Sequence, residues 1–250
     1  MAYFSGQGRI YIGERDAQGN PKMLLPVGNV PKLSVNLSVE TLEHKESQTG
    51  QRLTDLTIIK EKKGEFSCTL EEMLKVNMEL ALYGRSLTQE AGSVTDEALP
   101  TPAVAGGMAV LAHQNVSNVL ITDSSATPKT LPSAQYRVNG AHGSIVFLDT
   151  TTGGPYQEPF KASYTHDEAT VTSMFTLPLP ERWVRFEGLN TADGNRPVVI
   201  DLYRVAINPA KELSIITDEL LQFELSGNVL ADLTKPQDSA LGQFGRIVFV

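Results

Sequence analysis

The residue types that most often carry catalysis are few in this chain and lie far apart. The four histidines are not paired with one another or with the cysteine at the spacings of a metal site. One of them, His166, stands beside an acid, Asp167, and we favour a solvated loop position for it over a role as general acid or base. The other three are His44, His113 and His142.

Neither the cysteine nor the adjacent carboxylates point to a reaction. Cys68 alternates with Phe66 and Leu70, which predicts a buried thiol, whereas a nucleophile needs a polar, electropositive pocket. The pairs Glu71-Glu72 and Asp218-Glu219 fall where a helix and a turn or strand are expected to begin. The chain contains no Gly-x-Ser-x-Gly elbow and no Walker-type phosphate loop. We therefore predict no enzyme activity, no cofactor and no metal ion.

The composition describes a chain that holds its fold by packing. The 250 residues are 41% hydrophobic, a length that suits one large or two small domains, and one cysteine cannot form an internal disulfide. The 29 acidic and 21 basic residues give a net charge of −8, which argues against a broad surface that grips nucleic-acid phosphates. No apolar run approaches the roughly 18 residues of a membrane span, and the first residues do not resemble a secretory signal. We expect a soluble protein made in the cytoplasm, with no membrane contact.

Alternation of apolar and polar residues with a period of two dominates the chain and predicts β-strands. Residues 33–39 have aliphatic odd positions and polar even positions, as in a strand with one buried face. Alternating runs at 56–58 and 66–70 flank residues 61–64, whose lysines and glycine are typical of a hairpin turn. The basic cluster at this predicted tip is Lys60, Lys62 and Lys63. Further strands are expected at 171–175, 182–187, 197–207, 221–225 and 245–250.

One segment, residues 70–83, has the character of a helix. It is rich in helix-forming residues with one apolar stripe, and Thr69 with Glu72 fits a capping box. Gly84 fits the left-handed position that follows a last helical turn. A weaker and shorter helix is expected near 211–220.

The middle of the chain reads as an insertion. Residues 86–128 contain no lysine or arginine and carry several prolines and glycines, so they are expected to form a loop or linker. Turn signals then separate short strands expected at 135–138, 144–148 and 160–164, which indicates a small β unit. We therefore predict three parts, given in order: residues 1–95 as the N-terminal part of a core, 96–168 as linker and inserted β unit, and 169–250 as the C-terminal part of the core.

The order of several short segments resembles a known family. Val27-Gly-Asn-Val30 leads into the first clean strand, and the polar segment Glu43-His-Lys-Glu46-Ser-Gln-Thr-Gly50 and the capped helix follow it. Later come Tyr136-Arg-Val-Asn-Gly-Ala-His-Gly143 and the closing Phe223-Glu-Leu-Ser-Gly227. This succession resembles the major tail tube proteins of long-tailed, non-contractile (siphovirus-type) bacteriophages.

The resemblance implies a fold, an assembly and partners. The fold would be mainly β, a β-sandwich or half-barrel with one flanking α-helix and a small inserted β unit. Six copies would form a ring with a ring-shaped inner β-barrel, and stacked rings would form a tube in the tail of the virion, assembled in the host bacterial cytoplasm. The implied partners are the chain itself, a tape measure protein, a tail terminator and distal tail proteins, while DNA passes through without specific binding. The segment 40–53 best matches the loop that contacts the next ring, with its stacking residues Glu43, Lys45, Glu46, Gly50 and Arg52.

Elementary physical arguments favour the same assembly. Alternating strands leave sheet edges that need partners, and a head-to-tail contact between copies closes into a ring when its rotation allows. Six copies would bring a charge of about −48, screened over roughly 8–10 Å at physiological salt. An acidic or neutral polar bore would let DNA slide, because fixed cations would hold its phosphates. The candidate lumen-facing residues are Ser34, Asn36, Ser38, Thr57, Ser67, Gln222 and Glu224.

Three other functions stay open at this point. One is a virion-associated β-sandwich binding module that recognises a carbohydrate or receptor; its stacking aromatics would be Trp183, Tyr136, Tyr156 and Tyr164. Another is a hydrolase that uses unrecognised acids in a pocket. The third is the tube of a contractile tail or of a secretion needle.

Overall fold

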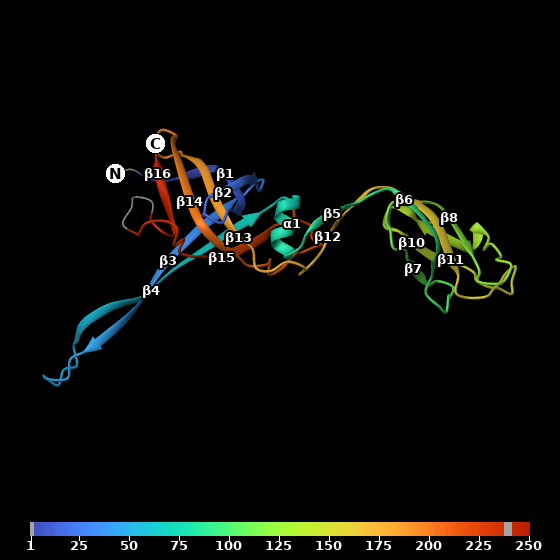
Figure 1. The fold of residues 1–250 in the computed structure, drawn as a ribbon, viewed down its shortest axis with the longest axis horizontal. Coiled ribbons are helices and arrows are strands. Elements are labelled where there is room, and N and C mark those ends of the chain that lie inside the picture. The colour runs from blue at the N-terminus through green and yellow to red at the C-terminus, as the bar shows by residue number, and fades with distance from the viewer. Residues whose placement is uncertain (1–2, 238–241) are drawn as a thin grey trace. The chain divides into compact units, whose positions relative to one another are not determined.

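The computed structural model describes residues 3–237 and 242–250 and shows a mainly β chain that divides into two compact units (Figure 1). Unit 1 combines the chain up to Ser86 with the chain from Thr172 onward, and unit 2 is Leu87–Val171. The structure thus places the unit boundaries at 86/87 and 171/172, where the sequence suggested 95/96 and 168/169. Mainly β architecture with a single α-helix among the described residues agrees with the prediction.

Unit 1 is built on one antiparallel sheet whose strand order is β2-β1-β13-β14-β15-β4-β3, with β16 added beside β14. One edge of β14 pairs with β13, and two strands share its other edge. Along that edge, Val198 to Leu202 pair with β16, and Val205 to Ile207 pair with β15. The path is open and ends at β2 and β3. The strands are β1 (Gly6–Arg15), β2 (Pro21–Pro26), β3 (Lys32–Lys45), β4 (Thr54–Leu70), β13 (Glu181–Asn190), β14 (Arg196–Ile207), β15 (Phe223–Val229) and β16 (Gly245–Phe249).

The core of unit 1 lies on one face of this sheet. Alternation along β4 and β15 sends Phe66, Cys68 and Leu70 to the same side as Phe223 and Leu225. These side chains are almost completely buried, and their packing stabilises unit 1. The single cysteine, Cys68, is free, so no internal disulfide contributes. The remaining buried members of this cluster are Ile10, Ile12, Val27, Leu80, Ala81, Val184, Leu202, Val205, Ile207 and Val229.

The helix α1 (Lys75–Leu82) is shorter than predicted and has no capping box. Leu70 still belongs to β4, where it pairs with Phe223, and the helix begins after Leu74, whose side chain makes no cap. Glu72, the expected capping residue, instead accepts a hydrogen bond from the Asn29 amide at 2.8 Å. The helix is fixed by a buried Asn77, whose Nδ2 donates to the carbonyls of Val27 and Glu72.

The end of α1 also differs from the prediction. Tyr83, with φ of 50°, takes the left-handed conformation that was assigned to Gly84. Gly84 is needed for another reason: a Cβ there would lie 1.7 Å from the Ser173 carbonyl oxygen. The carbonyls that a helix leaves open at its C-terminus are satisfied from outside, since Phe175 N donates to Leu82 O and Leu177 N donates to Tyr83 O.

The predicted hairpin turn at 61–64 is wrong. β4 runs without interruption from Thr54 to Leu70, and β3 pairs with it from Lys32↔Thr69 to Lys45↔Thr54. A lysine is compatible with a strand here because Lys63 pairs with Glu40, its diagonal neighbour on β3, and with Glu61 on its own strand, at 2.8 and 3.3 Å. Figure 1 shows the two strands leaving the sheet together as a long ribbon, with the turn at its far end.

Unit 2 contains two three-stranded antiparallel sheets, β7-β10-β9 and β6-β11-β8, with one core between them. Three of its strands lie close to the predicted positions: β9 (Tyr136–Asn139), β10 (Ser144–Phe147) and β11 (Lys161–His166). The region expected to be a linker holds the others, namely β5 (Ser86–Gln89), β6 (Gly92–Ala98), β7 (Met108–Val110) and β8 (Val116–Thr122). Two short 3₁₀ helices, Ser133–Gln135 and Gly140–His142, precede β9 and β10, and β12 (Ala169–Thr172) pairs with β5.

The strands of the expected linker escaped the sequence pattern for a physical reason. β6 and β8 are interrupted by bulges, where Asp96 and Asn118 have φ of 56° and 54°. A bulge shifts the side-chain alternation by one position, so a period of two fails across it. The helix expected near 211–220 is also wrong, because this segment forms neither helix nor strand.

Candidate functional site: an exposed β-arm, a polar sheet face and an apolar groove

The most exposed part of unit 1 is the outer portion of the β3–β4 ribbon, residues 36–63, which we call the β-arm. Every residue in it is exposed except Glu46, which is half-buried. Of the predicted stacking loop 40–53, Glu43 and Lys45 lie in strand β3, while Glu46, Gly50 and Arg52 lie in the turn. The segment is therefore a stiff paired ribbon with a short tip, rather than a flexible loop.

Glu46 organises the tip. Its carboxylate accepts hydrogen bonds from the Thr49 hydroxyl and from the backbone N–H groups of Gln48 and Thr49, at 2.7 and 2.9 Å for the two amides. These donors favour the charged form and lower the pKa of Glu46 to about 2. The chain reverses direction at Gly50 and Arg52, which both have positive φ, 78° and 52°. A hydrogen bond from Glu46 N to Leu53 O closes the turn.

Apolar side chains cover both faces of the β-arm. Large hydrophobic residues project from it, each with at least half of its surface exposed. An isolated two-stranded ribbon is only marginally stable in water. Exposed apolar surface of this kind is typical of regions that contact another molecule. These residues are Leu37, Val39, Leu42, Leu53, Leu56, Ile58 and Ile59.

A second surface, the polar face, is the side of β3, β4 and β15 that points away from the core. Strand register brings most of the candidate lumen residues together on it: Ser34 lies opposite Ser67, and their hydroxyl oxygens are 2.8 Å apart. Glu224 lies opposite Thr69 on the neighbouring pair of strands. Asn36 and Ser38 continue the same face of β3, and Gln222 precedes the buried Phe223.

Thr57 does not belong to this face. Between Glu40↔Glu61 and Thr41↔Ile59 the register advances by two residues on β4 and by one on β3, which makes Lys60 a bulge. Thr57 therefore lies opposite Glu43, on the side of Leu33 and Val35, and not on the side of Ser34.

The polar face also carries charges that the sequence interpretation missed. Lys32 and Lys63 lie on it, together with the acids Glu40, Glu61, Glu65 and Glu224. Lys63 contacts two of these acids, and its hydrogen bond to Glu40 raises its pKa above the usual value. Lys32 continues the alternation of residues 33–39 by one step, a signal present in the sequence, whereas Lys63 was hidden by its assignment to a turn.

An apolar groove opens on the core side of unit 1, with a volume of about 1030 Å³. Its walls come from β1, β3, β13, β14 and β16, through side chains such as Val35, Phe186, Ile200 and Ile247. Lys32 and Arg246 border the groove, but strand alternation turns both side chains to the opposite face of the sheet, where Arg246 donates to Asp201. β3 ends the sheet path and β16 pairs with β14 alone among the described strands, so strand edges border this groove.

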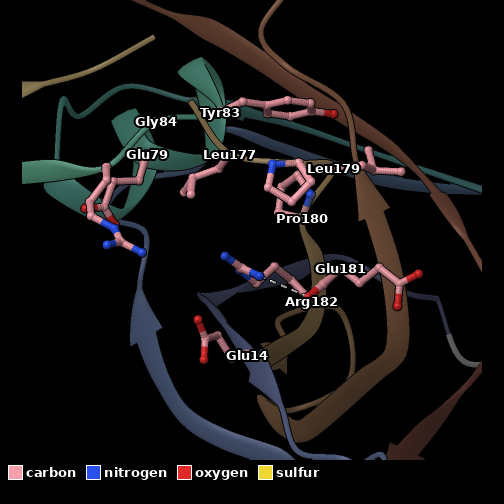
Figure 2. Close-up of a pocket in the computed structure, with 11 residues that line it drawn as sticks. Glu14, Glu79, Tyr83, Gly84, Leu177, Leu179, Pro180, Glu181 and Arg182 are labelled. Carbon is pink, nitrogen blue, oxygen red and sulfur yellow. Dashed lines mark hydrogen bonds between the residues drawn. The ribbon is translucent and has the colours of Figure 1, made fainter. Parts of the chain in front are cut away.

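A smaller cleft of about 370 Å³ lies beside the end of α1 (Figure 2). Arg182 extends into it between Leu177 and Glu14, and burial lowers the pKa of its guanidinium. The carboxylates of the cleft are already held, because Glu181 pairs with Arg204 at 2.7 Å and Glu14 pairs with Lys22 at 3.1 Å. Its third acid, Glu79, accepts a hydrogen bond from Ser86 N at 2.8 Å. The three carboxylates of the cleft therefore already have partners within the chain.

Two of the residues singled out for chemistry, Cys68 and His166, lie in packed positions. Cys68 is buried, and burial raises the pKa of its thiol to about 12, which keeps it protonated. His166 is not in a solvated loop as expected, but lies in β11, 8% exposed and stacked on His113 with ring centres 3.8 Å apart. His113 also contacts the Tyr164 hydroxyl, which donates to Glu97. His44 lies in the β-arm with its Nδ1 2.6 Å from Asp55.

The aromatic residues proposed for carbohydrate stacking are not presented to solvent as a platform. Trp183, Tyr136 and Tyr164 are buried, with Trp183 in unit 1 and the two tyrosines in unit 2. Tyr156 is half-buried and packs against Phe160. Trp183 instead donates from Nε1 to the buried Asp201 at 3.3 Å.

The described residues contain neither a metal-binding cluster nor a membrane-spanning helix. In residues 3–237 and 242–250, no group of three or more histidine, cysteine, aspartate or glutamate side chains is placed to hold a metal ion. Within the same ranges, the helices are too short or too polar to cross a membrane.

Comparison with known proteins defines the family of the chain. No curated protein matches it. A family profile matches residues 3–248, which is nearly the whole sequence. The chain therefore belongs to the family described as "Protein of unknown function UCP028589".

Proposed function

We propose that this protein is the structural subunit of a bacteriophage tail tube, in which stacked hexameric rings conduct DNA into the host cell. The protein would reside in the virion tail, and a tape measure protein, a tail terminator and distal tail proteins would be its other partners. The proposal rests on the succession of segments along the sequence and on surfaces that one copy leaves uncovered. The single observation that carries it is the β-arm.

The β-arm supports self-assembly because nothing in its own chain covers it. Leu42 is 60% exposed on one face and Leu37 is 78% exposed on the other, so water contacts both sides of the ribbon. Burying such side chains is worth roughly 1.5–3 kcal/mol each. A neighbouring copy in the next ring would provide that cover, and the ordered tip at Glu46 and Gly50 would be the first part to make contact.

The edges of the sheet support ring closure. The unit 1 sheet is open and curves over a groove, which suits a half-barrel or sandwich core with α1 at its side. Its end strands β2 and β3 differ from each other, so a contact between the edges of two copies would be head-to-tail. Six such contacts would produce a ring with a continuous inner barrel.

The polar face supports a bore that does not hold DNA. It carries four acids, Glu40, Glu61, Glu65 and Glu224, against two lysines, and one of those lysines is bridged by two of the acids. A surface with excess negative charge repels phosphates, while its serines and asparagines keep it wet. Fixed, unpaired cations would instead give salt-dependent binding.

Negative-stain electron microscopy of the purified chain at increasing concentration tests the assembly. We expect discrete rings with a central hole, and then stacks of rings, as the concentration rises. Monomers at every concentration would overturn the proposal. The same rings should not retain double-stranded DNA in a filter-binding assay at 0.1 M salt, and retention would overturn the proposed character of the bore.

A further inference from the structure

Two histidines of unit 2 stack on each other. His113 lies in the loop 111–115 that joins β7 to β8, and His166 is the last residue of β11. Their ring centres are 3.8 Å apart, with 22° between the ring planes. His166 is buried and His113 is half-buried. Because two cations this close repel each other where water is partly excluded, the stack suits a pair that carries one positive charge and not two.

The surroundings of His113 favour a charge on that ring. Its Nδ1 lies 3.1 Å from the hydroxyl oxygen of Tyr164, and this hydroxyl donates its own proton to Glu97. Burial and the neighbouring Glu97 carboxylate raise the pKa of Tyr164, so the hydroxyl stays protonated. The Tyr164 oxygen therefore accepts from an Nδ1–H group of His113. A positive charge on His113 is linked through this chain of hydrogen bonds to a carboxylate.

The surroundings of His166 oppose a charge. Its Nδ1 is buried and has no hydrogen-bond partner among residues 3–237 and 242–250. The backbone of β6 approaches the other side of the ring, because a Cβ at Gly92 would lie 3.0 Å from Nε2. A charged His166 would carry a proton on Nδ1 with no acceptor, beside a second cation. The closed unit therefore holds one added proton on the pair.

The other charges around the pair do not alter this balance. Glu97 is already engaged, since it also accepts a hydrogen bond from Ala112 N at 2.9 Å. The sequences of β7 and β8 contain no charged residue, and Lys161 lies at the opposite end of β11 from His166. The remaining titratable groups beside these segments are exposed, where water and salt screen them: Glu90, Asp96, His142, Asp167 and Glu168.

The loop 111–115 is the element that can respond to a second proton. β11 is the central strand of its sheet and is paired on both edges, so His166 stays in place. The loop is held by separate hydrogen bonds: Ala112 N donates to Glu97, and Asn115 N donates to Ala141 O at 3.4 Å. Movement of the loop takes His113 off the stack and brings His166 into contact with water, where it can be charged.

We propose that the stacked histidines are an acid-sensitive latch, in which uptake of a second proton from solvent opens the loop 111–115. An imidazole in water takes up its proton near pH 6.5, so opening begins in mildly acidic solution. The open form binds one proton more than the closed form. The equilibrium constant for opening therefore rises about tenfold for each pH unit lost below about pH 6. The latch lies within unit 2 and does not depend on the tube proposal.

Hydrogen exchange of the full chain at pH 7, 6 and 5 tests the latch. Protection factors correct for the intrinsic pH dependence of exchange. Between pH 6 and pH 5 they should fall about tenfold for the amides of Ala112 and Asn115. The amides of Leu131 and Phe147, which donate to Ile121 O and Gly107 O, should change by less than about twofold. Unchanged protection of the loop amides would overturn the proposal.

A variant and a matched control show whether His166 is the group responsible. His166→Phe keeps an aromatic ring against His113 but cannot take the second proton, so the loop amides should have the same protection at pH 6 and pH 5. His142→Gln removes an exposed histidine of the same unit, whose Nδ1 lies 3.0 Å from Asn139 Oδ1, and should behave as the wild type does. Circular dichroism confirms that both variants are folded. A pH dependence that survives His166→Phe, or one that is lost in His142→Gln, contradicts the latch.

Nuclear magnetic resonance of the wild type gives a test that needs no variant. As the pH is lowered from 7, the imidazole signals of His113 should shift first, while the Ala112 amide keeps its protection. The signals of His166 should shift only together with the loss of that protection. If both rings take up protons while the Ala112 amide stays protected, the closed unit accommodates two charges and the latch does not exist.

Discussion

Unit 2 and the β-arm are both built from paired strands that carry aliphatic residues, but those residues are buried in one region and exposed in the other. In unit 2, Ile121 and Ile145 are completely buried. In the β-arm, Leu37, Leu42 and Ile59 keep 78%, 60% and 56% of their surface exposed. Hydrophobicity alone therefore does not decide which residues a chain buries.

The difference comes from the number of layers. Unit 2 places two three-stranded sheets against one shared core, so each strand has apolar neighbours on its inner side. The β-arm has two strands and no second layer, so its side chains have nothing of their own chain to pack against. A region of the first kind buries its apolar residues within a single copy, whereas a region of the second kind leaves apolar surface that another molecule could cover.

The largest effect should follow from making the β-arm polar. Leu56→Asp with Ile58→Asp should raise the concentration needed for assembly by roughly 1,000-fold, since two buried contacts are worth about 3–6 kcal/mol together and each 1.4 kcal/mol is tenfold. Sedimentation velocity measures the change. The monomer should keep its unfolding free energy within about 0.5 kcal/mol, because both residues are exposed there. A variant that assembles normally would show that the β-arm is not an interface.

The opposite pattern is expected for the core of unit 2. Ile145→Ala should cost about 2–5 kcal/mol in the unfolding of unit 2, because a fully buried residue leaves a cavity. The matched change in the β-arm, Ile59→Ala, should cost less than about 0.5 kcal/mol in the monomer. Urea unfolding followed by Trp183 fluorescence for unit 1 and by circular dichroism for both units separates the transitions. Equal losses for the two changes would contradict the contrast between the regions.

The sequence allowed the strands to be predicted wherever one face is buried and the pairing is regular. Residues 33–39 and 197–207 lie in β3 and β14, and Cys68 is in the core, because period-two alternation reports a buried face directly. Prediction from alternation failed at bulges. The bulge at Lys60 turns Thr57 to the other face, and the bulges at Asp96 and Asn118 concealed two strands. A bulge depends on the partner strand, which a single sequence does not show.

Other failures came from long-range contacts. The signals for a capping box at Thr69 and Glu72 are real, yet tertiary pairing of Leu70 with Phe223 extends the strand instead. The groove and the exposed segment 211–222 could not be found from the sequence, because burial and exposure of apolar residues are set by packing partners far along the chain. Most of the polar face was found, because it needs only the alternation within each strand.

The smallest effects concern acid, and they distinguish the two regions again. Asp123 in unit 2 is buried and accepts hydrogen bonds from the backbone N–H groups of Lys129 and Gln157, at 2.7 and 3.1 Å, which lower its pKa to about 2. Glu46 in the β-arm has a pKa of about 2 from donors within its own turn, such as Thr49. Both carboxylates stabilise their surroundings above their ordinary pKa values near 4, and that stabilisation is lost as the pH falls toward 2.

The consequences of losing the two charges should differ in extent. Asp123 joins its own turn, through Ser125 and Lys129, to the distant Gln157, so the thermal midpoint of unit 2 should fall between pH 4 and pH 2. Asp123→Asn should make that midpoint lower at pH 7 and less dependent on pH. Glu46 holds only its neighbours, so Glu46→Gln should leave that midpoint unchanged and alter only the amide signals of Gln48 and Thr49 in NMR spectra. An Asp123→Asn chain with the pH dependence of the wild type would show that unit 2 does not depend on this buried carboxylate, and a Glu46→Gln chain with a lower midpoint would show that the arm tip is part of the folding core.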